Sequence, residues 1–343
     1  MQAKVFERAA LDALVTEAFG GAPQTVEAME GGASSRRYFR VTVPGGKTAV
    51  VMFVPDGLTP EEASKERASR WPFLEVHELL VNARVAVPII YADASPQGYL
   101  LLEDLGERTL AQVVASEPAR KEALYRRAVS DSVAAQLQLA PLAAGTIVAT
   151  RRFDEELLKW ELDHFREWGL DARGVTLGDN ARGRFERLTT ALAREIAAMP
   201  TAIVHRDYQS RNLMVRGDGT LVWIDFQDAL IGPRVYDLVA LLNDSYQSFE
   251  PAFIGQRIVE AAEAQGLHPE TLAFEFHLVT VQRKLKDAGR FVFIDRVKGN
   301  PNFLPFVDPT LRKVRRSMAA IGAKHPVVEE LASILDPYLP ADL

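Results

Sequence analysis

The feature that most constrains this chain is a polar segment placed directly before a strand hairpin. The segment is His205-Arg206-Asp207, with Asn212 five residues after Asp207. Two short β-rich runs follow, 213–215 and 221–224, joined by a turn that contains two glycines, and Asp225 comes directly after the second run. A hairpin returns the chain to the end from which it started. We therefore expect Asp207, Asn212 and Asp225 to lie together.

This set of side chains suits one kind of chemistry. In phosphoryl transfer to a hydroxyl group, one carboxylate orients or deprotonates the acceptor, while an amide and a second carboxylate hold magnesium. Oxygen ligands are those that Mg²⁺ prefers. We predict that Asp207 is the catalytic base and that Asn212 and Asp225 are metal ligands. The alternative, a chance tripeptide and a strand-capping Asp225, requires three elements to coincide at the right spacing.

The first hundred residues have the pattern of a small lobe rich in β-structure. Apolar residues recur every four positions in 6–19, which predicts a helix that Gly20-Gly21 ends. The runs 37–43 and 48–54 are separated by Pro44-Gly45-Gly46 and predict a hairpin. The remaining predictions are a charged helix interrupted by Pro72 and two further strands, at 60–81, 87–91 and 99–103. We expect a sheet of about four or five strands with helices packed on it.

After Asp104-Leu105-Gly106 the chain becomes mostly helical. Helices are predicted at 117–140, 152–169 and 181–199, and from residue 236 to the C-terminus, with a short strand at 203–204. We therefore predict an α+β fold with two domains. Residues 1–104 form the small domain, with the nucleotide-binding sheet and the phosphate loop. Residues 105–343 form the helical domain, with the catalytic loop, the metal site and the acceptor site.

Composition excludes several classes of protein. The chain has 343 residues, a net charge of −6 and no cysteine, so disulfide frameworks, thiolate metal sites and cysteine nucleophiles are excluded. A net acidic chain argues against general nucleic-acid binding. The longest apolar runs, such as Ala49–Val54, are too short to span a bilayer, and the first residues do not have the pattern of a signal peptide. We expect a cytoplasmic monomer that binds neither nucleic acid nor membranes.

The segments 203–214 and 221–242, IVHRDYQSRNLM and LVWIDFQDALIGPRVYDLVALL, resemble the aminoglycoside-phosphotransferase-like kinases. Weaker similarity is seen in EGGASSRRYFRV, LLLEDLG and LKDAGRF. Within that family the chain most resembles the bacterial N-acetylmuramate/N-acetylglucosamine anomeric kinases of cell-wall recycling. The resemblance implies a bilobal fold like that of protein kinases, with ATP and Mg²⁺ as cofactors. It also implies a contact between Asp237 and the backbone of the catalytic loop.

A glycine-rich turn and a following hinge are the candidates for nucleotide binding. Backbone amides and hydroxyls of the turn can surround phosphates, arginines can reach phosphate oxygens, and the hinge after Leu102 suits an adenine base. The predicted residues are Gly31, Gly32, Ser34, Ser35, Arg36, Arg40, Glu103 and Leu105. The family usually has a lysine in the third strand of the small lobe, but Met52 occupies the corresponding position here. A thioether cannot neutralise phosphate, so an arginine such as Arg40 substitutes, or magnesium and backbone groups hold the nucleotide.

The acceptor site is predicted from charge. Residues 281–316 contain ten Lys and Arg against three Asp, which suits an anionic acceptor such as the lactyl carboxylate of N-acetylmuramate. Arg283, Lys286 and Arg290 share one helix face, and a solvated basic surface remains the alternative. Asp228 and Arg211 are further substrate candidates, although Asp228 suits a helix N-cap equally well.

These predictions lead to one function with two alternatives. The first is an ATP-dependent kinase that phosphorylates the anomeric hydroxyl of N-acetylmuramate and N-acetylglucosamine in peptidoglycan recycling. The second has the same chemistry with another small acceptor, an aminoglycoside or an amino alcohol. The third is a pseudokinase that binds nucleotide without transferring phosphate, which the absent lysine suggests and the complete set of Asp207, Asn212 and Asp225 opposes.

Overall fold

The computed structural model describes residues 4–29, 35–55, 71–142 and 144–341. The chain divides into two compact units. Unit 1 is residues 1–109 together with 213–227, and unit 2 is residues 110–212 together with 228–343. The sequence predicted a boundary after residue 104 and placed 213–227 in the C-terminal domain, whereas the structure packs this hairpin with the N-terminal residues.

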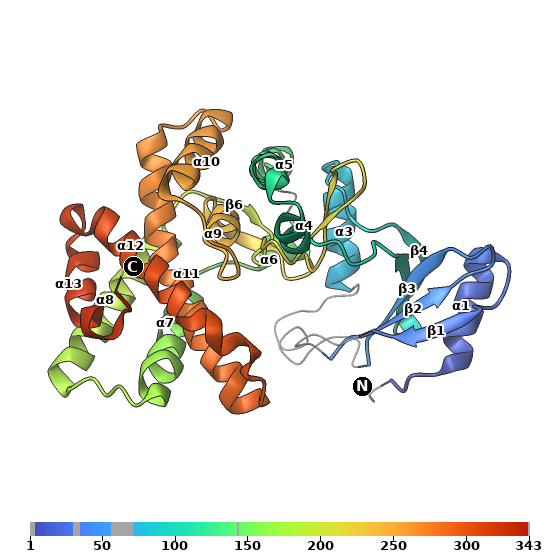
Figure 1. The fold of residues 1–343 in the computed structure, drawn as a ribbon, viewed down its shortest axis with the longest axis horizontal. Coiled ribbons are helices and arrows are strands. Elements are labelled where there is room, and N and C mark those ends of the chain that lie inside the picture. The colour runs from blue at the N-terminus through green and yellow to red at the C-terminus, as the bar shows by residue number, and fades with distance from the viewer. Residues whose placement is uncertain (1–3, 30–34, 56–70, 143, 342–343) are drawn as a thin grey trace. The chain divides into compact units, whose positions relative to one another are not determined.

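Unit 1 contains a five-stranded antiparallel sheet in the order β1-β2-β3-β5-β4 (Figure 1). Its elements are α1 (Arg8–Phe19), β1 (Thr25–Ala28), β2 (Arg37–Thr42), β3 (Thr48–Phe53), α3 (Pro72–Asn82), β4 (Ile90–Ala94) and β5 (Tyr99–Glu103). The hairpin β7 (Leu213–Val215) and β8 (Leu221–Trp223) forms a separate two-stranded sheet. Helix α1 ends at Gly20, which adopts the left-handed conformation (φ 74°) and donates its N–H to the carbonyl of Thr16.

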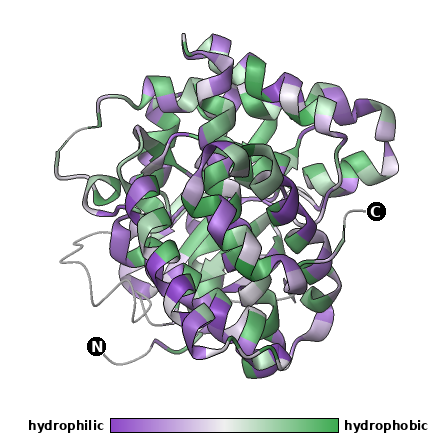
Figure 2. Ribbon diagram, turned by 90° about the vertical axis from the view of Figure 1, so that its left-hand side faces the viewer, coloured by the Kyte–Doolittle hydropathy of each residue, from purple (hydrophilic) through white to green (hydrophobic). Residues whose placement is uncertain are grey.

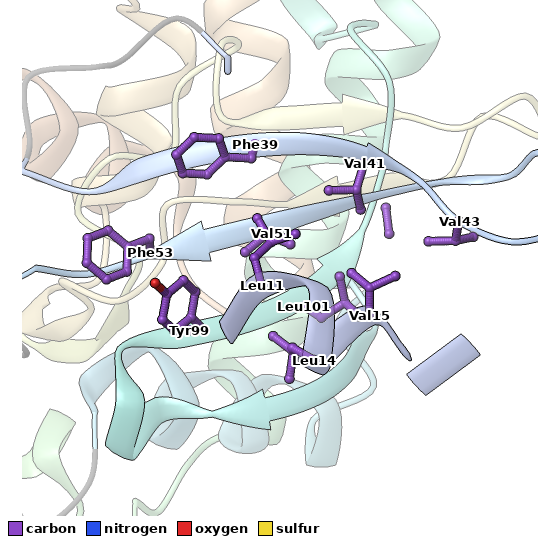
Figure 3. Close-up of a cluster of buried hydrophobic side chains, with 11 residues drawn as sticks. Leu11, Leu14, Val15, Phe39, Val41, Val43, Val51, Phe53, Tyr99 and Leu101 are labelled. Atoms are coloured by element: carbon purple, nitrogen blue, oxygen red, sulfur yellow. The ribbon is translucent and has the colours of Figure 1, made fainter. Parts of the chain in front are cut away.

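The core of unit 1 lies between α1 and one face of the sheet (Figure 3). Alternate residues of each strand point to this face, as the two-residue period of a strand requires. The buried side chains are Leu11, Leu14, Val15, Phe39, Val41, Val43, Ala49, Val51, Phe53, Tyr99 and Leu101. Met52 lies between Val51 and Phe53 in the chain, so its side chain points to the opposite face of the sheet. It is paired across the sheet with Tyr38 and Leu100, and it is also fully buried.

Unit 2 is mostly helical and carries one two-stranded sheet, β6 (Thr201–Val204) with β9 (Leu230–Pro233). Its helices are α4 (Leu110–Ser116), α5 (Lys121–Gln138), α6 (Ile147–Thr150), α7 (Glu155–His164), α8 (Asp179–Ala197), α9 (Tyr236–Leu242), α10 (Pro251–Ala264), α11 (Pro269–Lys298), α12 (Val307–Ile321) and α13 (Pro326–Leu335). Hydrophilic and hydrophobic residues alternate along most of the helices (Figure 2), as expected where one helix face is buried and the other is exposed. None of the described helices is long and apolar enough to cross a membrane.

Residues 60–70 of the helix predicted at 60–81 lie outside the described residues, and the rest of that helix is present as α3. Most other predicted elements are present, with some differences, and the helical region predicted from residue 236 is divided into α9 to α13. The strand predicted at 87–91 begins later, as β4 at Ile90. The helix predicted at 152–169 is α-helical only to His164 and continues as a π-helical segment, η3 (Phe165–Leu170). Strands β1 and β9 and helices α4 and α6 were not predicted.

Candidate active site

The predicted catalytic loop connects β6 to β7, and its first half is held by Asp237 from α9. The carboxylate of Asp237 accepts hydrogen bonds from the backbone N–H groups of His205 (2.7 Å) and Arg206 (3.1 Å). The implied contact between Asp237 and the loop backbone is therefore present. Asp237 is 2% exposed, and burial raises its pKa to about 6, although His205 and the two N–H groups act in the opposite direction. These bonds hold Arg206 with φ at 76°, a conformation that non-glycine residues rarely adopt.

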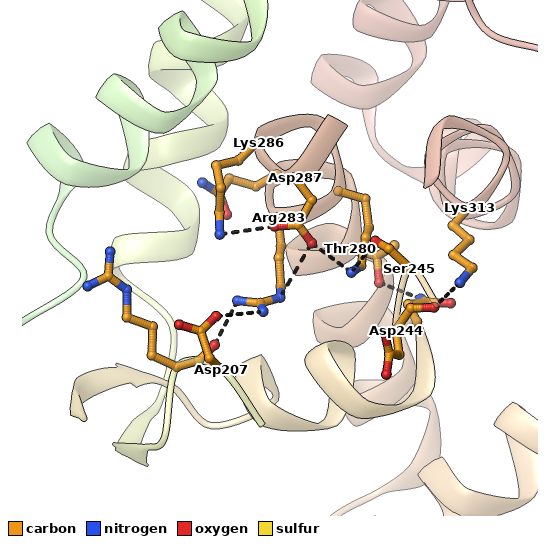
Figure 4. Close-up of polar contacts among 12 residues, drawn as sticks. Asp207, Asp244, Ser245, Thr280, Arg283, Lys286, Asp287 and Lys313 are labelled. Atoms are coloured by element: carbon orange, nitrogen blue, oxygen red, sulfur yellow. Dashed lines mark hydrogen bonds and ion pairs between the residues drawn. The ribbon is translucent and has the colours of Figure 1, made fainter. Parts of the chain in front are cut away.

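Arg283 of α11 contacts the next peptide of this loop (Figure 4). Its Nη1 donates to the carbonyl oxygen of Arg206 (2.8 Å), and its Nη2 lies 3.4 Å from Oδ1 of Asp207. The Asp207 side chain remains 39% exposed, whereas that of Arg283 is fully buried. Burial alone would raise the pKa of Asp207, but the positive charges of Arg283 and Lys286 hold it below its usual value. Asp207 is therefore an ionised carboxylate with one oxygen held in place.

The second half of the loop is held by Asp244, which follows α9. Oδ2 of Asp244 accepts hydrogen bonds from the backbone N–H (2.9 Å) and the hydroxyl (2.5 Å) of Ser210. Lys313 of α12 donates to the carbonyl of Asp244 and to that of Gln247. The Nδ2 of Asn212 donates to the carbonyl of Asp207 (2.9 Å). The amide oxygen of Asn212 is therefore the atom that this residue can offer to a metal.

Asp225 belongs to unit 1 and follows β8. Leu213, the first residue of β7, pairs with Trp223, the last residue of β8. Asn212 therefore directly precedes β7, and Asp225 comes two residues after the end of β8. The Asp225 side chain is half exposed, and its Oδ1 lies 3.9 Å from Nη1 of Arg36. Gln227 donates its Nε2 to the same oxygen (2.9 Å). Asp225 is therefore an accessible carboxylate with a cation beside it.

Three of the predicted nucleotide residues, Gly31, Gly32 and Ser34, lie outside the described residues, and Ser35 begins the next described segment. Arg40 lies on β2, where its guanidinium contacts two carboxylates of unit 1. The distances are 2.8 Å to Asp104 and 3.1 Å to Glu107. Arg40 therefore already has anionic partners, which makes it less suited to phosphate than the sequence suggested.

The predicted hinge residues line a cavity of about 550 Å³ in unit 1. Its walls are residues 103–108 and residues 215–218 of the β7–β8 hairpin. Both Glu103 and Leu105 belong to this lining, and the carboxylate of Glu103 accepts two hydrogen bonds of 2.7 Å from Nη2 of Arg216. The side chain of Glu103 thus connects the hinge with the hairpin. The groups that the hinge can offer to an adenine base are therefore those of its backbone.

The predicted acceptor residues have different environments. Arg283 was predicted to face an acceptor, but it is completely buried against the catalytic loop. Lys286 lies 3.0 Å from Asp287, and Arg290 lies over the ring of Phe293 (4.8 Å). Arg211 lies over the ring of Tyr246 at 3.5 Å. Asp228 is partly exposed at the start of the second segment of unit 2.

Three residues of this region were not predicted from the sequence. Asp287 pairs with Lys284 (2.8 Å) and Lys286. Asp244 accepts the hydrogen bond from Ser210. Burial raises the pKa of the Tyr246 phenol, and the charges of Asp287 and Asp207 act in the same direction. Asp287 was visible only as one acidic residue within a basic segment. Asp244 and Tyr246 follow a helix and carry no motif that marks them.

Residues 25–274 match the model of the phosphotransferase enzyme family, and the chain belongs to that family. An N-acetylmuramate/N-acetylglucosamine kinase of Pseudomonas aeruginosa is 35% identical over 312 residues, which are 88% of this chain and 85% of the relative. A protein of the same name from Pseudomonas putida is 33% identical over 296 residues, 84% of this chain and 82% of the relative. A solved GDP complex of aminoglycoside 2'-phosphotransferase-IIIa has a TM-score of 0.58 at 16% identity, covering 92% of this chain and 99% of that one. The predicted family and the predicted kinase-like fold are confirmed.

Proposed function

We propose that this protein is an ATP- and Mg²⁺-dependent sugar kinase that phosphorylates the anomeric hydroxyl of N-acetylmuramate and N-acetylglucosamine. The observation that carries the chemistry is the carboxylate of Asp207, ionised, partly exposed and held through one oxygen by Arg283. Its other oxygen is available to orient or deprotonate an acceptor hydroxyl. The choice of amino sugars rests on the names of the relatives that share about a third of their residues with this chain.

The donor set fits magnesium. Asn212 has its amide nitrogen engaged by the Asp207 carbonyl, which favours its oxygen as a ligand, and Asp225 adds a half-exposed carboxylate. Both are hard oxygen donors of the type that Mg²⁺ requires. A magnesium ion held by these two residues would neutralise charge on the nucleotide phosphates. The side chains of the protein then have to hold the acceptor hydroxyl in the orientation needed for attack on the phosphoryl group and prevent other orientations.

We propose Arg36 as the cation that compensates for the buried Met52. Arg36 is the residue whose guanidinium lies 3.9 Å from Asp225, and its side chain is only 11% exposed. Tyr38, two residues further along the chain on β2, hydrogen-bonds Arg36. Arg40, by contrast, has Asp104 and Glu107 as partners. A guanidinium can bind phosphate oxygens in a bidentate manner, so Arg36 is the better candidate of the two.

Lys286 and Arg290 remain the proposed contacts of the lactyl carboxylate, and Arg211 and Asp228 remain proposed acceptor contacts. The positive charge of Lys286 helps to lower the pKa of Asp207, and Lys286 also lies 3.0 Å from Asp287. Arg290 lies four residues further along α11, on the same face and one turn away. Two cations on one face of α11 are compatible with an anionic group on the acceptor. We further propose that the enzyme works as a monomer in the cytoplasm, where ATP is available.

The test is phosphoryl transfer followed by phosphorus NMR. The purified protein is incubated with Mg-ATP and N-acetylmuramate, and in parallel with N-acetylglucosamine, an aminoglycoside and choline. An anomeric phosphate signal that is split by coupling to H1 is expected for the two amino sugars. Transfer only to the aminoglycoside or to choline would retain the kinase and discard the proposed acceptor. The variant Asp207→Asn is the control that ties any signal to this site.

A further inference from the structure

The backbone of Arg206 is held on both sides of its Cα, through the N–H of one peptide and the C=O of the next. Arg206 has its φ at 76°, and a non-glycine residue keeps such a conformation only where surrounding contacts impose it. Asp237 accepts the N–H of Arg206, and Arg283 donates to its C=O. The two contacts come from different helices, α9 and α11. Both polar groups of the residue that precedes the catalytic carboxylate are thereby fixed.

Arg283 also reaches past the carbonyl of Arg206 to the carboxylate of Asp207. Its Nη1 and Nη2 bind different groups, the carbonyl of Arg206 and Oδ1 of Asp207. The guanidinium lies over the ring of Tyr236 (4.6 Å), and its Nε lies 4.0 Å from Asp287. A cation that is completely buried is costly unless it is paired in this way. The pairing is specific to arginine, because the planar fork presents two donors in a fixed geometry and the ammonium of lysine does not.

We propose that Arg283 is a positioning residue for phosphoryl transfer. By holding the Arg206 carbonyl and one oxygen of Asp207 together, Arg283 fixes the direction in which the other oxygen faces the acceptor hydroxyl. Arg283 is not a substrate contact, since no part of its side chain is exposed. This inference rests on the proposed function for its kinetic part only. The restraint on the loop is a property of the protein without substrate.

The test compares Arg283→Lys, which keeps the charge, with Arg283→Gln, which keeps an N–H donor. Both variants lose the pair of contacts that Nη1 makes with the Arg206 carbonyl and Nη2 makes with Asp207. We expect kcat to fall by about 10²-fold in each, the size of loss expected for a small misplacement of a reacting group, with the Kd for ATP unchanged within about twofold. The matched control is Arg296→Gln, on the same helix α11 but 62% exposed. It is expected to keep kcat, Kd and thermal stability.

A measurement without substrate separates positioning from chemistry. Hydrogen exchange of a peptide covering residues 203–212 is expected to be faster in Arg283→Lys than in the wild type, at a temperature where both are folded. This result does not require turnover. If the wild type fails to phosphorylate amino sugars, the proposed function is lost while the restraint on the loop is still tested.

A double-mutant cycle supplies the decisive kinetic comparison. If Asp237 and Arg283 together restrain the backbone of Arg206, the losses of kcat in Asp237→Asn and Arg283→Lys are not additive, because the second change removes a restraint that the first has already weakened. Additive losses would overturn the proposal. So would an Arg283→Lys variant that keeps kcat within about threefold and exchanges at the wild-type rate while melting at a lower temperature, since Arg283 would then serve stability alone.

Discussion

One oxygen of Asp207 is held by Arg283, and 39% of the Asp207 side chain is exposed. The change Asp207→Asn keeps the size and shape of the side chain and removes its charge and basicity. We expect kcat to fall by roughly 10³-fold or more, the combined scale of a lost general base and a lost charge in the site. The Kd for ADP, measured by calorimetry, should stay within about twofold. Turnover above a tenth of the wild-type rate would contradict the role of Asp207.

His164 makes the stability of unit 2 sensitive to pH. It is 8% exposed, it lies against the rings of Trp160 (5.4 Å) and Phe293 (5.3 Å), and its Nε2 has no hydrogen-bond partner among the described residues. Burial, followed by the charges of Arg290 and Lys286, lowers its pKa to about 4. The unfolded chain, with a histidine pKa of about 6.5, therefore binds more protons than the folded chain between these values. Stability is lost as pH falls through this window.

The change His164→Phe keeps the aromatic packing and removes the titration. We expect the wild type to lose on the order of 1–3 kcal/mol of unfolding free energy between pH 6.5 and pH 4.5, relative to the variant. Urea unfolding at several pH values measures this difference. The control is His268→Phe, at an exposed histidine, which should keep the wild-type dependence on pH. Parallel pH curves for the wild type and His164→Phe would show that His164 is not the group responsible.

At the level of single residues, the sequence could predict a candidate set of reacting groups and the support from Asp237, but not the support from Arg283 and Asp244. Asp207, Asn212 and Asp225 are close in the chain and follow a recognisable spacing, so chemistry alone suggests their roles. Arg283 is 76 residues from Asp207 in sequence and sits in a segment whose charge suits an exposed surface as well as a buried contact. Only the packing of α11 against the catalytic loop distinguishes these two environments. For the same reason the sequence could not distinguish Arg36 from Arg40 as a phosphate contact, because the carboxylates of Asp104 and Glu107 approach Arg40 only in the folded sheet.

Helix α11 packs closely on the π-helical segment η3 at a glycine. A Cβ added to Gly289 would lie 2.8 Å from Cα of Phe165 and 3.1 Å from the carbonyl oxygen of His164. Both neighbours are backbone atoms, which cannot move aside at low cost. We expect Gly289→Ala to lower the unfolding free energy by about 1–3 kcal/mol, the usual cost of overpacking. Denaturant unfolding measures the change.

The matched control is Gly183→Ala in α8. A Cβ at Gly183 meets nothing within 4 Å, and Gly183 lies in the interior of a helix, where alanine has the higher propensity. We expect this substitution to stabilise the protein by about 0.4–1 kcal/mol. Equal effects of the two substitutions would mean that the contact between α11 and η3 is not tight in solution.

The elements that the sequence failed to predict have local causes. The β-prone run at 87–91 includes Pro88, which has no N–H to donate to a ladder, and the paired strand begins only at Ile90. Strand β1 has mostly exposed residues and therefore lacks the alternation that marks a strand. The change from α-helix to π-helix after His164 leaves the apolar pattern helical, so periodicity cannot reveal it. By contrast, the hairpin of β2 and β3 was predicted because Pro44-Gly45-Gly46 is a strong turn signal.

At the scale of the whole molecule, unit 1 is not one continuous piece of chain. The hairpin 213–227 belongs to it, although about a hundred residues of unit 2 precede this hairpin in the sequence. The N–H of Trp223 donates to the carbonyl of Ala86 (2.8 Å), and the N–H of Val215 donates to that of Arg108 (2.8 Å). The ring of Phe226 lies 4.9 Å from that of Phe73. A cut after residue 109 would leave each of these partners in the N-terminal fragment without its contact.

We therefore expect residues 1–109 alone to fold poorly and a fusion that restores the hairpin to fold cooperatively. Thr109 and Met214 form an antiparallel bridge, so the chain leaves Thr109 beside Leu213, and about four Gly and Ser residues suffice to connect them. The fusion of 1–109 to 213–227 should show a single denaturant transition and little binding of the dye ANS, because Phe73 and the Ala86 carbonyl regain their partners. The fragment 1–109 should bind ANS strongly and lack a sharp transition. Equal cooperativity of the two proteins would mean that the hairpin is an accessory to the five-stranded sheet. A fusion as poorly ordered as the fragment would mean that unit 1 depends on unit 2 for its folding.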